Sequence, residues 1–289
     1  MNFHRRDFLK LSGAASAGLL LAQDAFATEL FAGKTPLKSF GLQLYTLRDV
    51  LPNDPAGVLK QVAAAGYKTI ESYTHDKLGM FWGMGNKGFK KFIDDLGMRM
   101  PSAHTDVYKD FEQKVDDAAA IGVKYMIHAY EGRGKSIDEY RKMADDFNKM
   151  GEYCKKHGMK LAFHNHDMSF ESINGEYGQK VLLDNTDAAN VCFEMDMYWV
   201  VTAGQDPIEW LKKYPNRFKL CHVKDRTKNA TEAADTCTLG KGSIDYAKIL
   251  PVAKKCGMEQ FIVEQEKYAG TTPIECMKDD AEYMRKLKI

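Results

Sequence analysis

Four short polar segments each directly follow an apolar, strand-like run, and this pattern constrains the fold more than any other feature of the chain. The segments are 164–167 (His-Asn-His-Asp), 194–196 (Glu-Met-Asp), 221–225 (Cys-His-Val-Lys-Asp) and 264–266 (Glu-Gln-Glu), and the runs before them are 159–163, 190–193, 217–220 and 260–263. Imidazoles and carboxylates at the carboxyl ends of successive strands converge on one point only if the strands are parallel and close into a barrel. The sequence therefore predicts a barrel mouth that holds a divalent metal.

The rest of the chain shows the same alternation of strand-like and helix-like blocks. Further strands are predicted at 40–45, 67–72, 98–103 and 123–129, and helices at 54–65, 89–96, 110–121, 136–157, 179–184, 206–213, 243–256 and 273–287. Eight such units predict an α/β chain folded as a single-domain (β/α)8 TIM barrel over residues 28–289. An open doubly wound sheet is disfavoured because no Gly-rich phosphate loop follows the first strand.

The amino-terminal segment, residues 1–27, resembles a twin-arginine export signal. Arg5 and Arg6 precede an apolar stretch at 11–22, and Ala25-Phe26-Ala27 supplies a small-x-small cleavage pattern. An ordinary amphipathic helix is the alternative, but these three features stand in the order that an export signal requires. We therefore expect the twin-arginine translocase to act on the chain and to deliver it to the periplasm or outside the cell.

The net charge and the hydropathy of the chain argue against a nucleic acid partner and against a membrane span. The formal net charge of the chain is +1 at pH 7, so the sequence does not indicate a polyanion-binding surface and we expect no nucleic acid partner. No later stretch approaches 18 apolar residues, so we expect no membrane span in the mature chain.

More polar side chains stand at the ends of the first four predicted strands than loop solvation accounts for. They are Gln43, Tyr45, Glu71, His104 and Glu131. Any one of them has an ordinary explanation as a solvated loop residue. Together with the four segments above, they indicate one site at the carboxyl ends of the strands.

Five motifs resemble those of the xylose-isomerase-like sugar isomerase/epimerase superfamily. The motifs are 41–48 (Gly-Leu-Gln-Leu-Tyr-Thr-Leu-Arg), 163–167 (Phe-His-Asn-His-Asp), 195–199 (Met-Asp-Met-Tyr-Trp), 222–225 (His-Val-Lys-Asp) and 240–245 (Gly-Lys-Gly-Ser-Ile-Asp). The likeness runs from about Leu37 to the carboxyl terminus. It is greatest to a secreted bacterial group of sugar phosphate isomerases/epimerases, related to inosose dehydratases and to lyases and hydrolases of 3-keto glycosides.

The resemblance implies a divalent metal held by residues at the ends of the fifth to eighth strands. Asp196, His222 and Glu264 match the family pattern, whereas His164 stands where the fifth-strand ligand is usually glutamate. Two imidazoles and two acids suit manganese, cobalt, zinc or iron better than magnesium, which prefers oxygen ligands. Strand alternation puts His164 and His166 on the same side, so either could be the ligand.

The resemblance also implies proton removal beside a carbonyl, with a metal that stabilises the enediolate. Epimerases of the superfamily use two metal-bound glutamates, and His164 replaces one of them here. The sequence therefore favours a lyase or hydratase over a symmetric epimerase. Because the chain is exported and shows no basic phosphate pocket, a non-phosphorylated keto sugar or 3-keto glycoside is the expected substrate.

The expected roles of the remaining residues follow from this chemistry. His166 or His104 would be the base, and Lys224 would stabilise the oxyanion or protonate a leaving oxygen. Lys224 could instead be a structural lysine paired with Asp225 or another acid. The expected substrate-binding residues are Gln43, Tyr45, Glu71, Glu131 and Trp199.

Other functions remain open at the level of sequence. An aldose-ketose isomerase or an epimerase of a free sugar would use the same metal set. A non-catalytic sugar-binding protein would need only the aromatic walls. A metal-dependent DNA-repair nuclease would require a basic surface, and a glycoside hydrolase would require two opposed carboxylates, for example Glu131 and Glu264.

Overall fold

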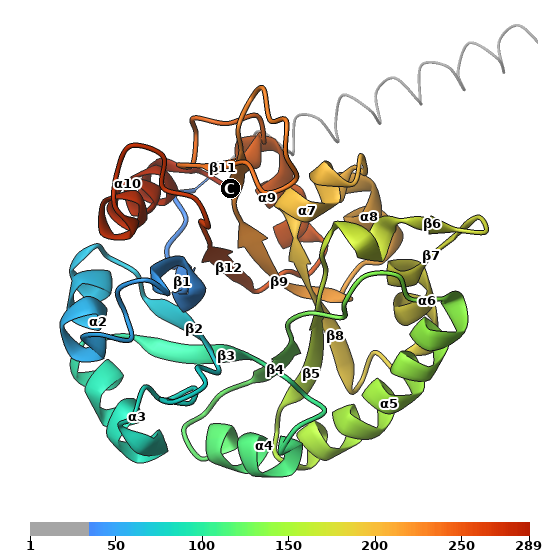
Figure 1. Cartoon of the computed structure of the whole chain (residues 1–289), viewed down its shortest axis with the longest axis horizontal. Coiled ribbons are helices and arrows are strands. Elements are labelled where there is room, and N and C mark those ends of the chain that lie inside the picture. The colour runs from blue at the N-terminus through green and yellow to red at the C-terminus, as the bar shows by residue number, and fades with distance from the viewer. Residues whose placement is uncertain (1–34) are drawn as a thin grey trace, which may run out of the picture.

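The computed structural model describes residues 35–289, and the expected export signal at 1–27 lies outside the described residues. Eight parallel strands form a closed barrel in the order β1-β12-β9-β8-β5-β4-β3-β2 (Figure 1). The strands are β1 (Gly41–Gln43), β2 (Thr69–Tyr73), β3 (Arg99–Thr105), β4 (Tyr125–His128), β5 (Lys160–His164), β8 (Val191–Asp196), β9 (Phe218–Val223) and β12 (Gln260–Val263). Pairing of β1 with β12 closes the barrel, which confirms the predicted (β/α)8 architecture.

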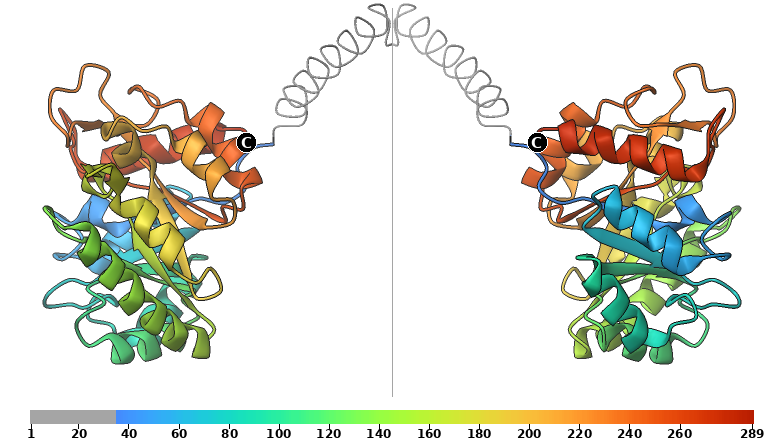
Figure 2. Two further views of the ribbon diagram at one scale, coloured as in Figure 1. Left: turned by 90° about the vertical axis from the view of Figure 1, so that its right-hand side faces the viewer. Right: turned by 90° about the vertical axis from the view of Figure 1, so that its left-hand side faces the viewer.

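Helices cover the outside of the barrel, as the two side views show (Figure 2). They are α2 (Pro55–Ala64), α3 (Gly85–Asp95), α4 (Phe111–Ala119), α5 (Ile137–Lys156), α6 (Gly178–Asn185), α8 (Pro207–Lys213), α9 (Tyr246–Lys255) and α10 (Pro273–Lys286). Capping boxes begin two of them, at Ser136 for α5 and at Thr272 for α10, where each side chain accepts a hydrogen bond from a backbone N–H of the first turn. No helix among residues 35–289 is long and apolar enough to cross a membrane.

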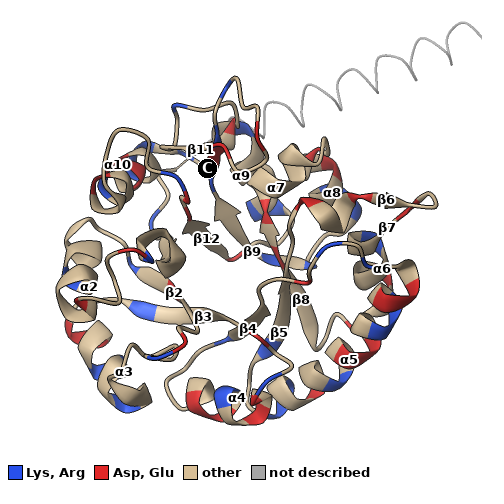
Figure 3. Cartoon of the chain, viewed as in Figure 1, with Lys and Arg blue, Asp and Glu red and all other residues tan. Residues whose placement is uncertain are grey.

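Charges of both signs alternate on the outer faces of the helices (Figure 3). Several are paired one helical turn apart, as in Lys90–Asp94 and Lys142–Asp146. Such exposed pairs contribute little stability each, about 0.3–0.5 kcal/mol. The concentration of buried charge is instead inside the barrel.

Several short elements at the barrel mouth were not predicted. The 3-10 helix η1 (Leu44–Leu47) and the helix α7 (Met197–Thr202) follow strands directly, and the 3-10 helix η2 (Asp167–Phe170) is separated from β5 by Asn165 and His166. Two small hairpins, β6 (Ser172–Ile173) with β7 (Glu176–Tyr177) and β10 (Asp225–Arg226) with β11 (Thr236–Cys237), lie in loops. Strands of two residues are too short to carry a period-two signal, so sequence periodicity could not reveal them.

The barrel interior has an apolar layer that positions the polar site above it. This layer consists of Tyr125, Ile127, Ala162, Cys192, Leu220 and Ile262. Inward-facing side chains recur every second residue along a strand. From Ala162, Cys192, Leu220 and Ile262, the next inward positions are therefore His164, Glu194, His222 and Glu264.

Candidate active site

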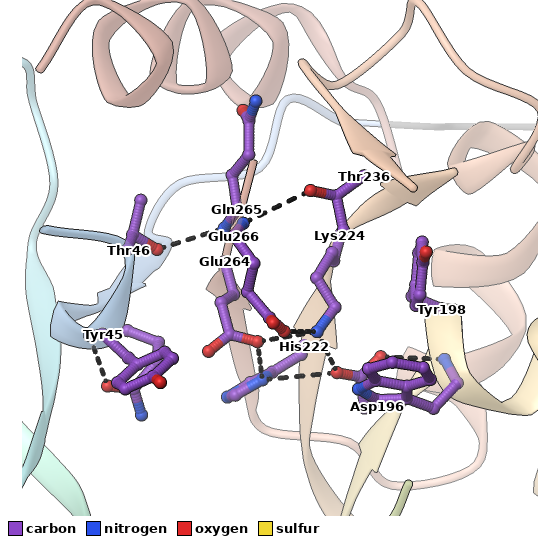
Figure 4. A network of polar contacts seen from close by, with 12 residues as sticks. Tyr45, Thr46, Asp196, Tyr198, His222, Lys224, Thr236, Glu264, Gln265 and Glu266 are labelled. Carbon is purple, nitrogen blue, oxygen red and sulfur yellow. Dashed lines mark hydrogen bonds and ion pairs between the residues drawn. The ribbon is translucent and has the colours of Figure 1, made fainter. Parts of the chain in front are cut away.

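A buried lysine with three carboxylates around it occupies one side of the barrel mouth. Lys224 Nζ lies 3.0 Å from Asp196 Oδ2, 2.9 Å from Glu264 Oε2 and 2.6 Å from Glu266 Oε1. Figure 4 shows these side chains pointing toward one another from β8, β9 and the segment after β12. We call Asp196, Lys224, Glu264 and Glu266 the lysine cluster. Asp225 is not the partner of Lys224.

The lysine cluster keeps its charges at neutral pH. Burial alone would lower the pKa of Lys224, but the charges of Asp196 and Glu264 raise it well above its usual value. Burial would also raise the pKa of Glu264, yet Lys224 and His222 hold it well below its usual range. The rings of Tyr198 and Trp199 lie 5.1 and 5.0 Å from Nζ and add cation-π contacts.

Two carboxylates and two further histidines form a second group on the other side of His222. We call Glu71, His104, His164 and Glu194 the histidine cluster. His104 Nε2 lies 2.7 Å from Glu194 Oε2 and 3.0 Å from Glu71 Oε1. His164 Nδ1 lies 3.0 Å from the same Glu194 oxygen. Glu71 and Glu194 are both fully buried.

His222 connects the two clusters through its two ring nitrogens. Nδ1 lies 3.2 Å from Glu264 Oε2 in the lysine cluster, whereas Nε2 lies 2.8 Å from Glu71 Oε1 in the histidine cluster. The His222 ring stacks on His104, with centroids 5.3 Å apart and planes 11° apart. The His222 ring therefore contacts carboxylates of both clusters.

The pKa values in the histidine cluster are displaced in both directions. Burial alone would lower the pKa of His104, but the charges of Glu71 and Glu194 raise it to about 9. Burial and the Glu71 charge raise the pKa of Glu194 to about 7. Burial alone would raise the pKa of Glu71 as well, but His104 and His222 lower it. The raised pKa of His104 places an imidazolium charge beside these two acids.

Two overlapping groups of residues at the mouth could hold a metal ion: Asp196 with His222 and Glu264, and His164 with His104, Glu194 and His222. Asp196 Oδ2 lies 3.7 Å from His222 Nδ1 and 3.8 Å from His164 Nε2. It is fully buried, forms an ion pair with Lys224 and accepts no hydrogen bond of good geometry from the described residues. Two imidazole nitrogens and two carboxylate oxygens, one of them unsatisfied, fit manganese, cobalt, zinc or iron. His164, Asp196, His222 and Glu264 would hold such an ion.

His166 faces the same space but lacks a partner. Its Nδ1 is buried without a hydrogen bond and lies 4.0 Å from Glu131 Oε2, which is also unsatisfied. The other Glu131 oxygen accepts the Ser169 hydroxyl. Burial and the nearby Lys224 charge lower the pKa of His166 to about 4, and burial raises that of Glu131 to about 7. The Trp199 ring lies 5.4 Å from the His166 ring.

A pocket of about 380 Å³, which we call the mouth pocket, opens above these residues. Its lining is Tyr45, Tyr73, Thr74, His104, Thr105, Asp106, Ala129, Tyr130, His164, His166, Glu264 and Glu266. This lining includes three carboxylates and no lysine or arginine. The electrostatics of the mouth pocket therefore disfavour a phosphate group.

The expected substrate-binding residues take different positions. Tyr45 stands at the rim, with its ring against Tyr73. Gln43 is fully buried: its side-chain amide donates to Glu71 and accepts from the backbone of Tyr45. Trp199 is mostly buried, and its indole N–H has no partner. Gln43 and Glu71 thus lie beneath the mouth, where they position His104 and His222.

Two residues next to the site, Asn165 and Asp225, fix the backbone of the mouth through hydrogen bonds. The Asn165 side chain donates to the backbone carbonyl of Asp196 and accepts from its backbone N–H. Asp225 accepts hydrogen bonds from the backbone of Gly240, Gly242 and Ile244. A Cβ at Gly242 would lie 2.1 Å from the Asp225 carboxylate, so glycine is required there. The two motifs at 222–225 and 240–245 are therefore one structural unit.

Glu194 and Glu266 belong to the site, and sequence reasoning gave them no role. Each stands two residues from an expected ligand, Asp196 and Glu264 respectively, so strand alternation places it on the same side. The two-residue alternation that placed His164 and His166 on the same side also predicts that Glu194 and Glu266 face the site. Glu194 joins the histidine cluster, and Glu266 completes the lysine cluster.

Comparison with known proteins gives concordant results for the signal and the barrel. Residues 2–22 match the twin-arginine translocation pathway signal sequence, which supports export across the cytoplasmic membrane. An inosose dehydratase of Clostridium perfringens is 27% identical over 249 residues, which cover 72% of this chain and 81% of that protein.

Solved structures show the same fold. A sugar phosphate isomerase/epimerase from Parabacteroides distasonis is 31% identical, with a TM-score of 0.72 over 87% of this chain and 95% of that one. The IolI protein with a bound zinc atom is 17% identical, with a TM-score of 0.70 over 84% of this chain and 95% of that one, a likeness of fold alone. Residues 59–287 match the family described as xylose isomerase-like TIM barrel. Together with the closed eight-stranded barrel, this match shows that the chain belongs to the xylose isomerase-like TIM barrel family.

Proposed function

We propose that this chain is a metal-dependent enzyme of the periplasm, or secreted, that removes the proton beside the carbonyl of a keto sugar and eliminates a leaving group from the adjacent carbon as water or an alcohol, or that catalyses the reverse addition of water to the unsaturated product. The substrate class is a non-phosphorylated keto sugar or 3-keto glycoside. The observation that carries the proposal is the gathering of Asp196, His222 and Glu264 at distances that suit one metal ion, with His164 Nε2 3.8 Å from Asp196 Oδ2 and His166 in the wall of the mouth pocket.

The charge balance of the site supports a divalent cation. Five carboxylates meet there, from Glu71, Glu194, Asp196, Glu264 and Glu266, and they outnumber the compensating cations, which are Lys224 and the imidazoles of His104 and His222, whose pKa values are raised. Buried carboxylates without compensating charge are costly. When bound, a divalent metal would supply Lewis-acid stabilisation of negative charge on the sugar oxygens.

His166 is our choice for the base that removes the carbon-bound proton. It lines the mouth pocket, and its Nδ1 is buried beside Glu131, which leaves Nε2 as the nitrogen that would meet the substrate. His104, the other candidate, has its Nε2 occupied by Glu71 and Glu194. A nitrogen that already donates to carboxylates is poorly placed to accept a proton from the substrate.

Lys224 supports the reaction from behind the pocket wall. Its Nζ contacts Glu264 and Glu266, both of which line the mouth pocket. We assign it the role of holding these two carboxylates and placing positive charge beside the developing oxyanion. Glu131 and Tyr45 would contact sugar hydroxyls and a sugar face, and Trp199 would complete the wall behind His166.

The choice of a lyase or hydratase over an epimerase rests on the asymmetry of the site. A two-glutamate proton exchange needs a glutamate facing Glu264, and the fifth strand supplies His164 instead. A base and an acid of different residue types, in place of two glutamates, suit elimination or addition of water. An aldose-ketose isomerase or an epimerase is the alternative, and a non-catalytic sugar-binding protein is a further one.

Product analysis in deuterated water distinguishes these functions. The purified chain is incubated with 3-keto glucosides and, separately, with free aldoses and ketoses, and the products are followed by nuclear magnetic resonance. We expect loss or gain of water from the 3-keto substrates and deuterium at the carbon beside the carbonyl. His166→Gln should abolish deuterium incorporation while sugar binding persists. Turnover of free aldoses alone would establish the isomerase, and binding without turnover would establish the sugar-binding protein.

A further inference from the structure

A second pocket adjoins the mouth pocket and is larger. We call it the side pocket, and its volume is about 590 Å³, within the range of about 300–1,000 Å³ usual for small-molecule sites. It lies between the loop after β3, the loop after β4 and the first half of α5. Thr105, Asp106, Ala129 and Tyr130 line both pockets, so the two are contiguous.

Two residues in the wall of the side pocket have a buried polar atom without a hydrogen-bond partner among residues 35–289. His128 is 94% buried there (6% exposed), and its Nδ1 has no hydrogen-bond partner among the described residues. Glu131 lines the same pocket and presents its unsatisfied Oε2 near the junction with the mouth. Buried polar atoms without partners are unusual in folded proteins, and both occur here in residues that line the side pocket.

The large exposed aromatic side chains of residues 35–289 all stand at these two pockets. Tyr45, Tyr108 and Tyr130 have exposures of 42%, 52% and 56%. Tyr45 lines the mouth pocket, Tyr108 the side pocket, and Tyr130 both. Tyrosine presents a flat apolar face with a polar tip, which suits a sugar ring that has an apolar face and polar edges.

We infer that the side pocket binds a second sugar ring joined to the ring that reacts in the mouth pocket, so that the preferred substrate is a glycoside of disaccharide size. The inference rests on the proposed function for the position of the reacting ring. Tyr130 at the junction would contact both rings, and Tyr108 would cover the second ring alone. His128 and Glu131 would receive its hydroxyl groups.

The charges of the side pocket favour a neutral, hydroxyl-rich occupant. Its lining carries four acids, Asp106, Glu131, Glu139 and Asp146, against two lysines, Lys135 and Lys142. Lys142 is already paired with Asp146 at 2.6 Å. This balance disfavours a phosphate group, and the number of charged residues disfavours an apolar aglycone.

Binding of unreactive sugars tests this inference without relying on turnover. Calorimetry compares α- and β-linked glucose disaccharides with the corresponding methyl glucosides, using the full chain and its variants. We expect at least one disaccharide to bind about tenfold more tightly than its methyl glucoside. Tyr108→Ala should remove this difference while leaving methyl glucoside binding unchanged, and Tyr108→Phe should retain it.

Matched controls separate the side pocket from general damage to the fold. Tyr153→Ala truncates a tyrosine of α5 that lies outside both pockets, and it should change the affinity for neither sugar. Equal affinity of disaccharides and methyl glucosides, absent disaccharide binding at millimolar concentration, or equal losses for both sugars in Tyr108→Ala would overturn the inference. Tighter binding of glucose phosphates than of disaccharides would overturn it as well.

Kinetics on oxidised substrates distinguish this inference from the proposed function. The same pair of variants is assayed on a 3-keto disaccharide and a 3-keto methyl glucoside. We expect Tyr108→Ala to lower kcat/KM about tenfold for the disaccharide alone, mainly through KM. Absence of turnover of every keto sugar by the unmodified chain would count against the proposed function, whereas the binding comparison would still decide the role of the side pocket.

Discussion

The lysine cluster and the histidine cluster share His222 but neutralise their carboxylates in different ways. In the lysine cluster, the fixed charge of Lys224 lowers the pKa values of Asp196 and Glu264 despite burial. In the histidine cluster, imidazoles carry the compensating charge, and the pKa of Glu194 rises to about 7. The first group therefore offers permanent charge beside the mouth, and the second offers protons that can be exchanged. Four substitutions break or sharpen this comparison.

The largest effect is expected at Glu264, which we propose as a metal ligand and which contacts Lys224. Glu264→Gln removes an anionic metal ligand, so we expect kcat/KM to fall by at least ~100-fold and bound metal to be lost. Elemental analysis and steady-state kinetics measure the two quantities. Glu266→Gln, which removes a carboxylate of the same cluster but not a ligand, is the matched control and should keep its metal. Retention of metal by Glu264→Gln would remove this residue from the ligand set.

Removal of the fixed charge should destabilise the chain and increase its dependence on metal. Lys224→Met leaves three carboxylates without their cation, and breaking a buried ion pair in this way costs about 3–5 kcal/mol. We expect a marked fall in Tm without metal and a larger gain in Tm on adding manganese than the unmodified chain shows. Thermal unfolding with and without metal provides the measurement. A smaller metal-induced gain in the variant would argue that Lys224 and the metal act at separate places.

A substitution in the histidine cluster should act on the metal only indirectly. Glu194→Gln weakens the contacts that orient His164 and His222, and changes of this kind lower metal affinity or activity by about 10–100-fold. Metal titration by calorimetry should show the weaker affinity, with one ion per chain still bound at saturation. Glu264→Gln, by contrast, is expected to lose the ion rather than to bind it more weakly. Equal losses in the two variants would mean that Glu194 is itself a ligand.

The smallest effect concerns Glu131, which stands outside both clusters. Burial raises its pKa to about 7 in the folded chain, above the usual value of about 4.5. The folded state therefore holds a proton that the unfolded state releases between about pH 4.5 and 7, and stability falls as pH rises through this window. Glu131→Gln keeps the acceptor for Ser169 and should remove this part of the pH dependence. Parallel pH profiles of Tm for the two proteins would contradict the assignment.

The strand-end pattern was sufficient to predict the barrel and the position of the site at its mouth. Alternation along strands says on which side a residue lies, and the family resemblance selected His164, Asp196, His222 and Glu264 among the residues there. It does not give the register between neighbouring strands. A register shift between Phe193 and Glu194 places Asp196 opposite His222, and this shift left no signal in the sequence.

The partners of individual side chains were less predictable than the site as a whole. The sequence left Lys224 open between a catalytic role and a pair with Asp225 or another acid, and the structure pairs it with Asp196, Glu264 and Glu266 rather than with Asp225. Asp225 is instead occupied by the backbone of the loop at 240–244. Such choices depend on contacts between loops distant in sequence, which no local pattern encodes.

We propose that the reaction on a keto sugar requires a divalent metal held by His164, Asp196, His222 and Glu264. The most direct measurement is the metal content of the purified chain together with its activity on 3-keto glucosides, before and after a chelator. We predict one ion per chain, loss of activity on its removal, and recovery with manganese, cobalt, zinc or iron more than with magnesium. Undiminished activity in chains shown to be free of metal would contradict the account.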